Sequence, residues 1–549
     1  MSLGALKICV PQLNFTIGDF EGNTSKIADA IYTAKQQNVD LVVFSEMTVC
    51  GYLPDDLLDY PHFIERCEQS LEVVAQSCQG IAALVGGVMR NPGKGRLLQN
   101  VMCFMQNGKI EHVIAKTLLP TYDVFAEERY FESAKSQDPF DFKGVKIGVA
   151  ICEDLWDLYN DFEYTISPGK ELKEKGAELI INPSASPFNI GKNSHRNRVF
   201  VGQVSRFNLP VLYVNQVGIH TEVLFDGSSR AVNPNGEVAM QLPEFKEATV
   251  IVEFENGNFK DSSTVLTVGD DSVDLMYRAL VFGVKDYFQK MGFKQAILGS
   301  SGGMDSALVQ TICSDALGPE NVTAVLMPSK YSSDGSVSDA EQLSKNLGNP
   351  YLILPITEVH QAYDSTLSHV FEGTSMGIAE ENIQARSRAV ILMAMSNKFG
   401  KILVNTSNKS ELAVGYSTLY GDLCGSISVI GDVYKTQVYA MAEYLNKETE
   451  RIPTSILTKE PSAELRPDQK DSDSLPIYPI LDGILRLYIE ERKGKDEIIL
   501  EGYDASTVSR IIHLVNANEY KRYQAPPIIR VSSKAFGKGR IMPLVAKYS

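Results

Sequence analysis

The stretch Ala296-Ile-Leu-Gly-Ser-Ser-Gly-Gly-Met-Asp-Ser306 decides the fold of the second half of the chain. Ala296 to Leu298 are apolar and predict a buried strand, and an apolar helical pattern follows from Ala307. The small residues between them let the backbone approach a ligand, and N–H groups at a helix N-terminus bind anions. Asp305 is placed to hold the cation that accompanies a phosphate. An ordinary Gly/Ser loop is the alternative, but Ser-Gly-Gly-x-Asp-Ser directly after a strand favours phosphate binding.

This loop is not a Walker loop, because no Gly-Lys-Ser/Thr follows it. It resembles the pyrophosphate loop of the ATP pyrophosphatases, which use ATP to adenylate a substrate and release pyrophosphate. Strand-like segments at Asn321 to Met327 and Lys401 to Val404 alternate with helical ones. This alternation, with a glycine-rich first turn, predicts a doubly wound parallel sheet that binds ligands beyond the carboxyl ends of its strands.

Composition limits the classes of protein to which the chain can belong. At 549 residues it is too long for one hydrophobic core, so two or three domains are expected. The net charge of −16 argues against a broad nucleic-acid or membrane surface, and no run approaches the ~18 apolar residues of a transmembrane helix. The eight cysteines form no CxxC pair, and the N-terminus leads into a strand without a signal peptide. We therefore expect a cytoplasmic protein with no nucleic-acid or membrane partner.

Three polar residues follow predicted strands in the first half of the chain. Strand Leu41 to Phe44 ends in Ser45-Glu46, strand Val145 to Ile151 ends in Cys152, and Lys116 lies where a strand leads into a long loop. Singly, they have ordinary explanations as a solvated strand end, a buried thiol and a surface lysine. Together they form a chemical set: a lysine favours the thiolate and stabilises an oxyanion, and a carboxylate moves the proton.

These segments resemble the Glu–Lys–Cys triad of the nitrilase (carbon–nitrogen hydrolase) superfamily. The resemblance implies a four-layer α-β-β-α sandwich in which Cys152 is the nucleophile, Glu46 the general base and Lys116 the oxyanion partner. In members that use glutamine, the contacts with glutamine correspond to Tyr122, Phe125, Ser186 and Lys192. We place this domain at residues 1–258, followed by a polar and acidic linker at residues 259–272.

Four polar segments after the phosphate loop resemble the NAD synthetase family in their order. They are Glu381 to Arg386, Asn405 to Glu411, Gly415 to Asp422 and Lys435-Thr436. The resemblance implies a Rossmann-like domain of the adenine nucleotide alpha hydrolase type at residues 273–549. A Pro-rich, charged segment from Lys459 to Asp482 is expected to form a mobile loop over the active site.

The same resemblance implies binding residues for two substrates and a metal ion. Implied ATP contacts are Gly299, Ser300, Ser301, Gly302, Gly303, Met304, Asp305, Ser306, Thr406 and Lys435. Implied contacts with nicotinic acid adenine dinucleotide are Asn382, Glu411, Asp422 and Lys521. Asp305 and Glu411 are the implied Mg²⁺ ligands. Ser300 departs from the apolar residue expected in this loop.

Fused in this order, the two halves resemble the glutamine-dependent NAD synthetase family. The resemblance implies an enzyme that converts ATP, nicotinic acid adenine dinucleotide and glutamine to NAD, AMP, pyrophosphate and glutamate, with Mg²⁺ as cofactor. The resemblance also implies that ammonia passes internally from the glutaminase site to the synthetase site, and that the chain forms a homo-oligomer, a homo-octamer.

Two alternatives from other classes remain open on the sequence. The chain could be a free nitrilase-like hydrolase with a degenerate second half, or a nucleotide-binding regulatory protein without turnover. Intact Asp305 and Glu411 argue against the first, and the complete set of Glu46, Lys116 and Cys152 argues against the second. Release of AMP only in the presence of nicotinic acid adenine dinucleotide would separate all three.

Overall fold

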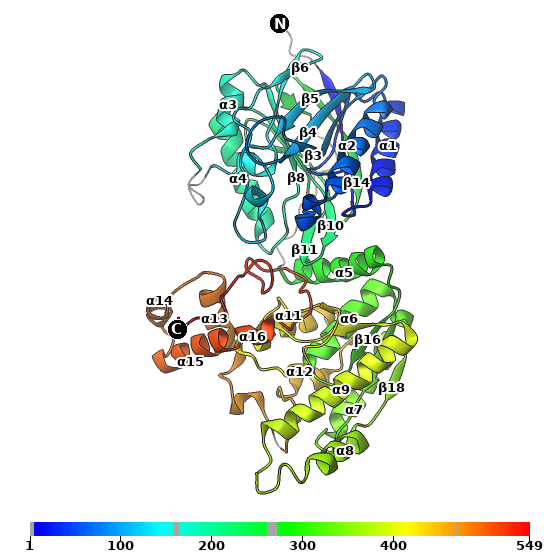
Figure 1. Cartoon of the computed structure of the whole chain (residues 1–549), viewed down its shortest axis with the longest axis vertical. Coiled ribbons are helices and arrows are strands. Elements are labelled where there is room, and N and C mark those ends of the chain that lie inside the picture. Colours follow the sequence, from blue (N-terminus) through cyan, green and yellow to red (C-terminus); the bar gives the residue numbers. More distant parts are fainter. Residues whose placement is uncertain (1–4, 159–163, 261–271, 468, 549) are drawn as a thin grey trace. The chain divides into compact units, whose positions relative to one another are not determined.

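The structure of the protein is a computed structural model that describes residues 5–158, 164–260, 272–467 and 469–548. The chain divides into two compact units, residues 1–270 and 271–549 (Figure 1). Residues 261–271 of the expected linker lie outside the described residues, whereas Phe259, also assigned to it, belongs to a strand of the first unit. The predicted linker, residues 259–272, therefore begins at least one residue too early.

Two sheets make up most of the described part of the first unit. One has seven strands in the order β15-β14-β1-β2-β3-β4-β5, and the other has six in the order β13-β12-β9-β8-β7-β6. The strands of the first sheet are β1 (Leu6–Gln12), β2 (Leu41–Val43), β3 (Ala82–Arg90), β4 (Leu98–Gln106), β5 (Lys109–Ala115), β14 (Ala248–Glu255) and β15 (Asn258–Phe259). Those of the second are β6 (Phe140–Phe142), β7 (Val145–Val149), β8 (Leu179–Ser184), β9 (Val211–Asn215), β12 (Arg230–Val232) and β13 (Val238–Gln241). A separate hairpin joins β10 (Val217–His220) to β11 (Val223–Asp226).

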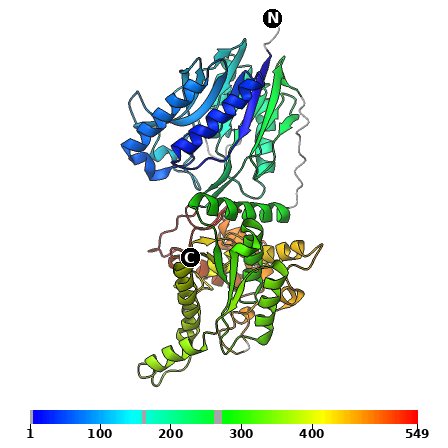
Figure 2. The ribbon, with the colours of Figure 1, turned by 90° about the vertical axis from the view of Figure 1, so that its right-hand side faces the viewer.

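Alternation along the strands creates four layers. In β1, Ile8 and Val10 join a core that also contains Ile147 and Ile181 of the second sheet, so this core lies between the sheets. Cys9 points the other way, into a core with the helices α1 (Phe20–Gln36) and α2 (Pro61–Ser77). On the second sheet, the outward side chains pack with α3 (Pro168–Glu174) and α4 (Lys192–Phe207). The layers are therefore α-β-β-α, as predicted, and Figure 2 shows the blue helices α1 and α2 outside their sheet.

The second unit is built on a parallel sheet of five strands in its described residues. Their order is β18-β17-β16-β19-β20. The strands are β16 (Ala296–Gly299), β17 (Val322–Leu326), β18 (Tyr351–Ile353), β19 (Ile402–Asn405) and β20 (Ile427–Ser428). The chain leaves the central β16 first toward β17 and later returns on its other side with β19. This reversal of strand order creates the crevice in which doubly wound folds bind their ligands.

Helices cover both faces of this sheet. One core packs α9 (Ile378–Phe399) on Ile297 and Leu403, and another packs α7 (Asp334–Leu347) on Ala324 and Leu326. The remaining helices are α5 (Ser272–Met291), α6 (Met304–Leu317), α8 (Thr357–Leu367), α10 (Lys409–Val414), α11 (Lys435–Leu445), α12 (Thr454–Thr458), α13 (Tyr478–Ile489), α14 (Lys495–Leu500), α15 (Ala505–Ala517) and α16 (Glu519–Arg522). The predicted Rossmann-like class is confirmed. In the part of the chain that the structure describes, no helix combines the length and apolarity needed to cross a membrane.

Candidate active sites

Cys152 lies at a sharp turn just beyond β7. It is the first residue of a short 3-10 helix, Cys152–Leu155, and it has a left-handed φ of 43°, which costs a non-glycine residue roughly 1–2 kcal/mol. The carboxylate of Asp154 holds this turn, because it accepts from Ile151 N at 3.0 Å. It also accepts from Thr117 N at 3.1 Å and Leu118 N at 2.7 Å. The turn that carries Cys152 is thus tied to the loop that carries Lys116.

Lys116 follows β5 directly and lies between two buried carboxylates. Its Nζ donates to Glu46 Oε1 at 2.7 Å and to Glu127 Oε1 at 2.8 Å. Asn100 Nδ2 donates to Glu46 Oε1 at 2.6 Å, and Ala185 N to Glu46 Oε2 at 2.9 Å. The loop of Glu46 passes so close to β3 that a Cβ on Gly86 would lie 2.5 Å from Ser45 O. Glu46 is therefore fixed in position by donors from three separate elements.

Burial favours the protonated thiol of Cys152. It raises the pKa of Cys152 well above the ordinary value, the charge of Glu46 raises it further, and Lys116 only partly offsets both. Burial alone would lower the pKa of Lys116, but the charges of Glu127 and Glu46 raise it well above its ordinary value. Lys116 therefore favours the thiolate of Cys152, as expected, but its effect on the pKa is smaller than that of burial. The carboxylates whose charges act on this thiol are Glu46, Glu153 and Glu127, and the effect of Glu46 is the largest of the three.

The four predicted glutamine contacts lie around this centre. Tyr122 OH donates to Glu153 Oε1 at 3.0 Å, and its ring packs edge-on against Phe125 with 5.3 Å between centroids. Ser186 follows Ala185, the residue that donates to Glu46, and its own N donates to Asn215 Oδ1 at 2.9 Å. Lys192 begins α4, and its Nζ lies 4.0 Å from the centroid of the Trp156 ring. The set thus combines one cation and two hydroxyls with the buried carboxylate of Glu153, groups that can bind both charges of an amino acid.

The predicted phosphate loop connects β16 to α6. Gly302 has a φ of +76°, and a Cβ there would lie 2.1 Å from Ser336 O, so no other residue fits without a shift of the backbone. Ser306 Oγ accepts from Ser301 N at 3.2 Å, and Ser301 Oγ accepts from Gly303 N at 3.2 Å. The hydroxyl of Ser300, the residue that departs from the family pattern, donates to Gln310 in the core at 3.0 Å. The side chain of Ser300 is thus engaged away from a ligand.

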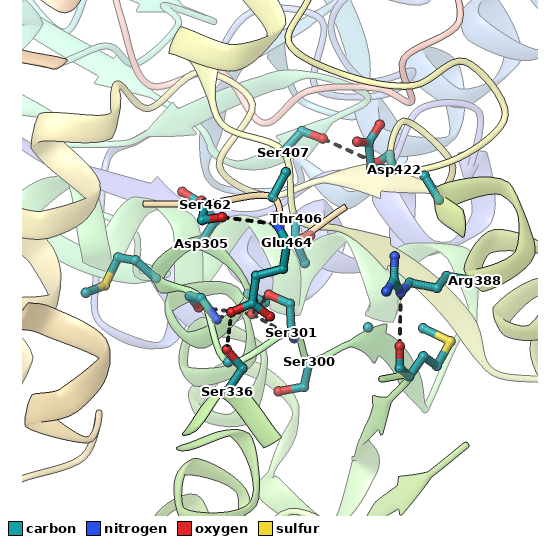
Figure 3. A pocket seen from close by; sticks show the side chains of 18 of the residues that line it. Ser300, Ser301, Asp305, Ser336, Arg388, Thr406, Ser407, Asp422, Ser462 and Glu464 are labelled. Atoms are coloured by element: carbon teal, nitrogen blue, oxygen red, sulfur yellow. Dashed lines mark hydrogen bonds between the residues drawn. The ribbon is translucent and has the colours of Figure 1, made fainter. Parts of the chain in front are cut away.

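This loop forms one wall of a cavity of about 320 Å³ (Figure 3). All ten predicted ATP contacts line the cavity, as do Glu411 and Asp422. Further lining residues include Ser336, Arg388, Asn405, Ser407, Tyr416, Tyr439, Lys459, Ser462, Glu464 and Asp471. The cavity lies beyond the carboxyl ends of β16, β17 and β19, where the fold predicts a ligand.

Lys435 lies between the two predicted metal ligands. Its Nζ donates to Asp305 Oδ2 and, at 3.4 Å, to Glu411 Oε1. Burial raises the pKa of Glu411 to about 8, and the charge of Asp305 raises it as well, while Lys435 lowers it. Two carboxylates thus converge on one cation in the cavity, next to the phosphate loop.

The four predicted contacts with nicotinic acid adenine dinucleotide are only partly together. Glu411 and Asp422 line the cavity, whereas Asn382 and Lys521 do not. The last two lie at the loop before Asp422: Thr418 Oγ1 donates to Asn382 Oδ1 at 2.7 Å, and Lys521 Nζ donates to Ser417 O at 2.8 Å. Thr418 N in turn donates to Asp422 Oδ1 at 2.6 Å. These contacts connect Asn382 and Lys521 to the edge of the cavity through this loop.

Two family patterns match the chain, one for each unit. Residues 7–259 match the carbon-nitrogen hydrolase family, and residues 276–525 match the NAD synthase family. The glutamine-dependent NAD(+) synthetase of Synechocystis sp. is 44% identical, over 98% of this chain and 99% of that protein. The enzymes of the same name from Acinetobacter baylyi and Thermotoga maritima are 40% and 39% identical, over at least 98% of each chain. This chain belongs to the glutamine-dependent NAD(+) synthetase family.

Solved structures agree with this assignment. The glutamine-dependent NAD(+) synthetase of Acinetobacter baumannii, solved with adenosine diphosphate, superposes with a TM-score of 0.79 at 37% identity and covers 98% of both chains. That of Cytophaga hutchinsonii superposes with a TM-score of 0.82 over 99% of this chain and 98% of its own. At 23% identity this second likeness supports the fold alone.

The donor set of this glutamine-dependent NAD(+) synthetase family member fits Mg²⁺. Asp305 and Glu411 offer hard oxygen ligands that already converge on a cation. Among the described residues no group of three or more His, Cys, Asp or Glu side chains forms a complete metal cage. Mg²⁺ commonly takes one or two carboxylates and completes its shell with water and substrate phosphates. The pair therefore suits a metal ion that is shared with a nucleotide.

Some residues of the two sites could not be singled out from the amino-acid sequence of this chain. Glu127 begins a short 3-10 helix, Glu127–Arg129, beside Glu128, which is exposed, and only the folded chain reveals that Glu127 is the buried one of the two. Arg388, Ser336 and Glu464 come from three separate elements and meet only in the cavity. Glu153 is the exception, because its position directly after Cys152 could have singled it out.

Proposed function

We propose that the chain makes NAD from nicotinic acid adenine dinucleotide, with ATP to activate the substrate and glutamine to supply nitrogen. One observation carries this proposal: a buried Glu46–Lys116–Cys152 site and a phosphate-loop cavity with Asp305, Lys435 and Glu411 occur in one chain of this family. An amidase alone needs no phosphate loop, and an ATP pyrophosphatase alone needs no cysteine nucleophile.

In the first unit, glutamine is split through a thioester. Glu46 takes the proton of Cys152, and the thiolate attacks the side-chain amide carbon of glutamine. Lys116 stabilises the resulting oxyanion, the carbon–nitrogen bond breaks, and ammonia leaves with the proton from Glu46. Water, deprotonated by Glu46, then cleaves the thioester to glutamate and restores Cys152. The positions of Tyr122, Phe125, Ser186 and Lys192 around Cys152 support their role in holding glutamine.

In the second unit, the carboxylate of nicotinic acid adenine dinucleotide attacks the α-phosphorus of ATP, and the bond to pyrophosphate breaks. Ammonia then attacks the acyl carbon of the adenylate, AMP leaves, and NAD forms. The N–H groups of residues 301–306 and the ammonium of Lys435 hold the phosphates, which places the α-phosphorus in line with the attacking oxygen. Mg²⁺, held by Asp305 and Glu411, would neutralise charge on the departing pyrophosphate. Thr406 is proposed to contact ATP, and Asn382, Asp422 and Lys521 the dinucleotide.

Two features of the proposal concern the cell and the assembly. All eight cysteines are free, which supports a reducing compartment such as the cytoplasm. The outer face of α9 exposes Val390 and Met393, and apolar exposure of this kind supports self-association, for which we propose a homo-octamer. Light scattering of the purified protein would test the octamer.

One assay tests the reaction as a whole. We expect AMP, glutamate and NAD to form together when ATP, nicotinic acid adenine dinucleotide and glutamine are all present. AMP should not form when the dinucleotide is omitted, because there is then no carboxylate to adenylate. Release of AMP without the dinucleotide, or no release with all three substrates, would contradict the proposal.

A further inference from the structure

The carboxylate of Glu464 lies in the cavity of the second unit, beside the phosphate loop (Figure 3). Its Oε1 accepts from Ser336 Oγ at 2.7 Å, from Ser333 Oγ at 3.1 Å and from Lys459 Nζ at 2.7 Å. Lys459 Nζ also contacts Ser336 Oγ. One ammonium and two hydroxyls thus surround a single carboxylate oxygen.

These donors stand at the N-terminus of the 14-residue helix α7. Ser333 is its N-cap, and Ser333 Oγ accepts from Ser336 N at 3.2 Å. The positive end of the helix dipole adds to the charge of Lys459. The phosphate loop touches the same point, because a Cβ on Gly302 would lie 2.1 Å from Ser336 O. The seat of the Glu464 carboxylate is therefore contiguous with the loop that we propose binds the phosphates of ATP.

The carboxylate in this seat is ionised at neutral pH. Burial opposes ionisation, but hydrogen bonds from Lys459 and Ser336 outweigh it and hold the pKa of Glu464 below the ordinary value. A polyphosphate and an ionised carboxylate repel each other and need the same donors. Only one of them can occupy this seat.

A further cation in the cavity, Arg388, has no ion pair among the described residues. Arg388 Nε donates to Met327 O at 3.0 Å, and no ion pair to the Arg388 guanidinium occurs among the described residues. Burial lowers the pKa of Arg388 to about 10, while Glu464 and Asp422 partly restore it. In Figure 3 the guanidinium faces the cavity. A half-buried guanidinium without an ion pair among the described residues, in the cavity that the phosphate loop lines, independently indicates an anionic ligand.

We propose that Ser333, Ser336 and Lys459 form the seat of the terminal phosphate of ATP, and that the Glu464 carboxylate fills this seat until the nucleotide displaces it. The inference rests on the proposed function, because it takes this cavity as the ATP site. The terminal phosphate belongs here because the α-phosphate must face the dinucleotide, and Ser336 and Glu464 lie apart from Asp422 in Figure 3. Glu464 thus acts as an internal competitor of ATP. It sets the concentration of ATP at which the Glu464 carboxylate leaves the seat and residues 459–467 lose this attachment.

Binding of inorganic pyrophosphate with Mg²⁺, and of α,β-methylene ATP, tests the proposal by calorimetry. Glu464→Gln keeps the shape but removes the competing charge, so both ligands should bind at least about tenfold more tightly. Lys459→Met removes a donor of the seat and should weaken both by about tenfold or more. Asp473→Asn is the matched control, because it also removes one negative charge from this part of the chain. The Asp473 carboxylate pairs with Arg466 outside the cavity, so the variant should bind both ligands with the affinity of the unaltered chain.

Hydrogen exchange on the unaltered chain gives a second measurement that needs no variant. Glu464 N donates to Ser462 Oγ at 3.1 Å and Leu465 N to Gln469 Oε1 at 2.8 Å, so both amides are protected while Glu464 is seated. Saturating pyrophosphate should speed their exchange. Unchanged or weaker affinity of Glu464→Gln, or slower exchange with pyrophosphate, would overturn the seat while ATP binding stands. No binding of either ligand to the unaltered chain would contradict the proposed function itself, and this inference with it.

Discussion

Lys116 Nζ lies 2.7 Å from Glu46 Oε1, and both side chains are at most 1% exposed. Glu127 Oε1 lies 2.8 Å from the same ammonium and is equally buried. One positive charge therefore lies between two carboxylates, and all three side chains are shielded from solvent. This makes Lys116 a structural requirement of the site as well as the oxyanion partner that we propose.

Lys116→Met should destabilise the first unit strongly. Removing one partner of a buried ion pair costs about 3–5 kcal/mol, because the remaining charges are left uncompensated. Lys175→Met is the matched control, since Lys175 also contacts two carboxylates, Asp138 and Glu171, but at a solvated position. Its denaturation midpoint should stay close to that of the parent. Equal midpoints for the two variants in urea would contradict the role given to the buried cation.

Glu127 predicts a pH dependence of stability. Burial raises its pKa to about 7, although Lys116 lowers it, so the folded state holds a proton that the unfolded state has lost. The stability from this proton is complete below the unfolded pKa, near 4.5, and is lost as pH rises through about 7. Glu127→Gln should remove this slope, of about 1.4 kcal/mol per pH unit at most. The measurement is the difference in unfolding free energy between parent and variant from pH 5 to pH 8, and parallel curves would exclude the shift.

The strand ends explain which residues of the first site could be predicted. Glu46 and Cys152 each follow an apolar strand that ends abruptly, Glu46 after β2 of the first sheet and Cys152 after β7 of the second. Glu127 follows no strand and has no periodic neighbours, so its burial depends on the path of the loop after Lys116. The resting state of Cys152 was beyond the sequence for a different reason. The protonation of this thiol depends on the balance between its burial and the opposite charges of Glu46 and Lys116, and the pattern of residues in the sequence does not reveal that balance.

In the second site, too, some residues could be predicted from the sequence and others could not. The phosphate loop is local in sequence, because one strand, one turn and one helix supply all its atoms, and so its residues could be located in the sequence before the structure showed that they line the cavity. The seat of Glu464 brings together Ser333 and Ser336 with Lys459 and Glu464, more than a hundred residues further along the chain. No pattern among neighbouring residues predicts a contact between segments so far apart in the sequence. The order of elements around a doubly wound sheet brings the two segments together.

Cys152→Ala should separate the two reactions. The variant loses the nucleophile that we assign to glutamine, so glutamine-dependent formation of NAD should fall below detection. Synthesis with an added ammonium salt should remain, most visibly at alkaline pH, where more of the ammonia is unprotonated. Cys103→Ala, which removes another buried thiol of the same unit, should keep its glutaminase activity. Loss of ammonium-driven synthesis in a folded Cys152→Ala protein would show that the two sites are not independent.

Asp305→Asn and Glu411→Gln test the proposed metal ligands. Each removes one anionic group beside Lys435 with little change of size, and loss of such a preorganised contact costs a factor of about 10² or more. We expect release of AMP, measured with an ammonium salt as nitrogen donor, to fall by that factor, while some hydrolysis of glutamine persists. Asp315→Asn, on the same helix as Asp305 but paired with Arg451, serves as the control. Near-normal release of AMP by both test variants would rule out the pair.

Gly302→Ala against Gly303→Ala tests whether the phosphate loop depends on one left-handed residue. At Gly302 the φ of +76° costs alanine roughly 1–2 kcal/mol, and its Cβ would also meet the backbone oxygen of Ser336 at 2.1 Å. The Ser336 oxygen belongs to the backbone and cannot turn aside as a side chain could, so the loop itself must move. We therefore expect Gly302→Ala to lose both the binding of α,β-methylene ATP and stability. At Gly303 the nearest atom to an added Cβ is Ser301 Oγ at 3.2 Å, the end of a side chain that can turn aside. Gly303→Ala should therefore melt close to the parent, and equal losses of melting temperature in the two variants would mean that the left-handed turn at Gly302 does not determine the loop.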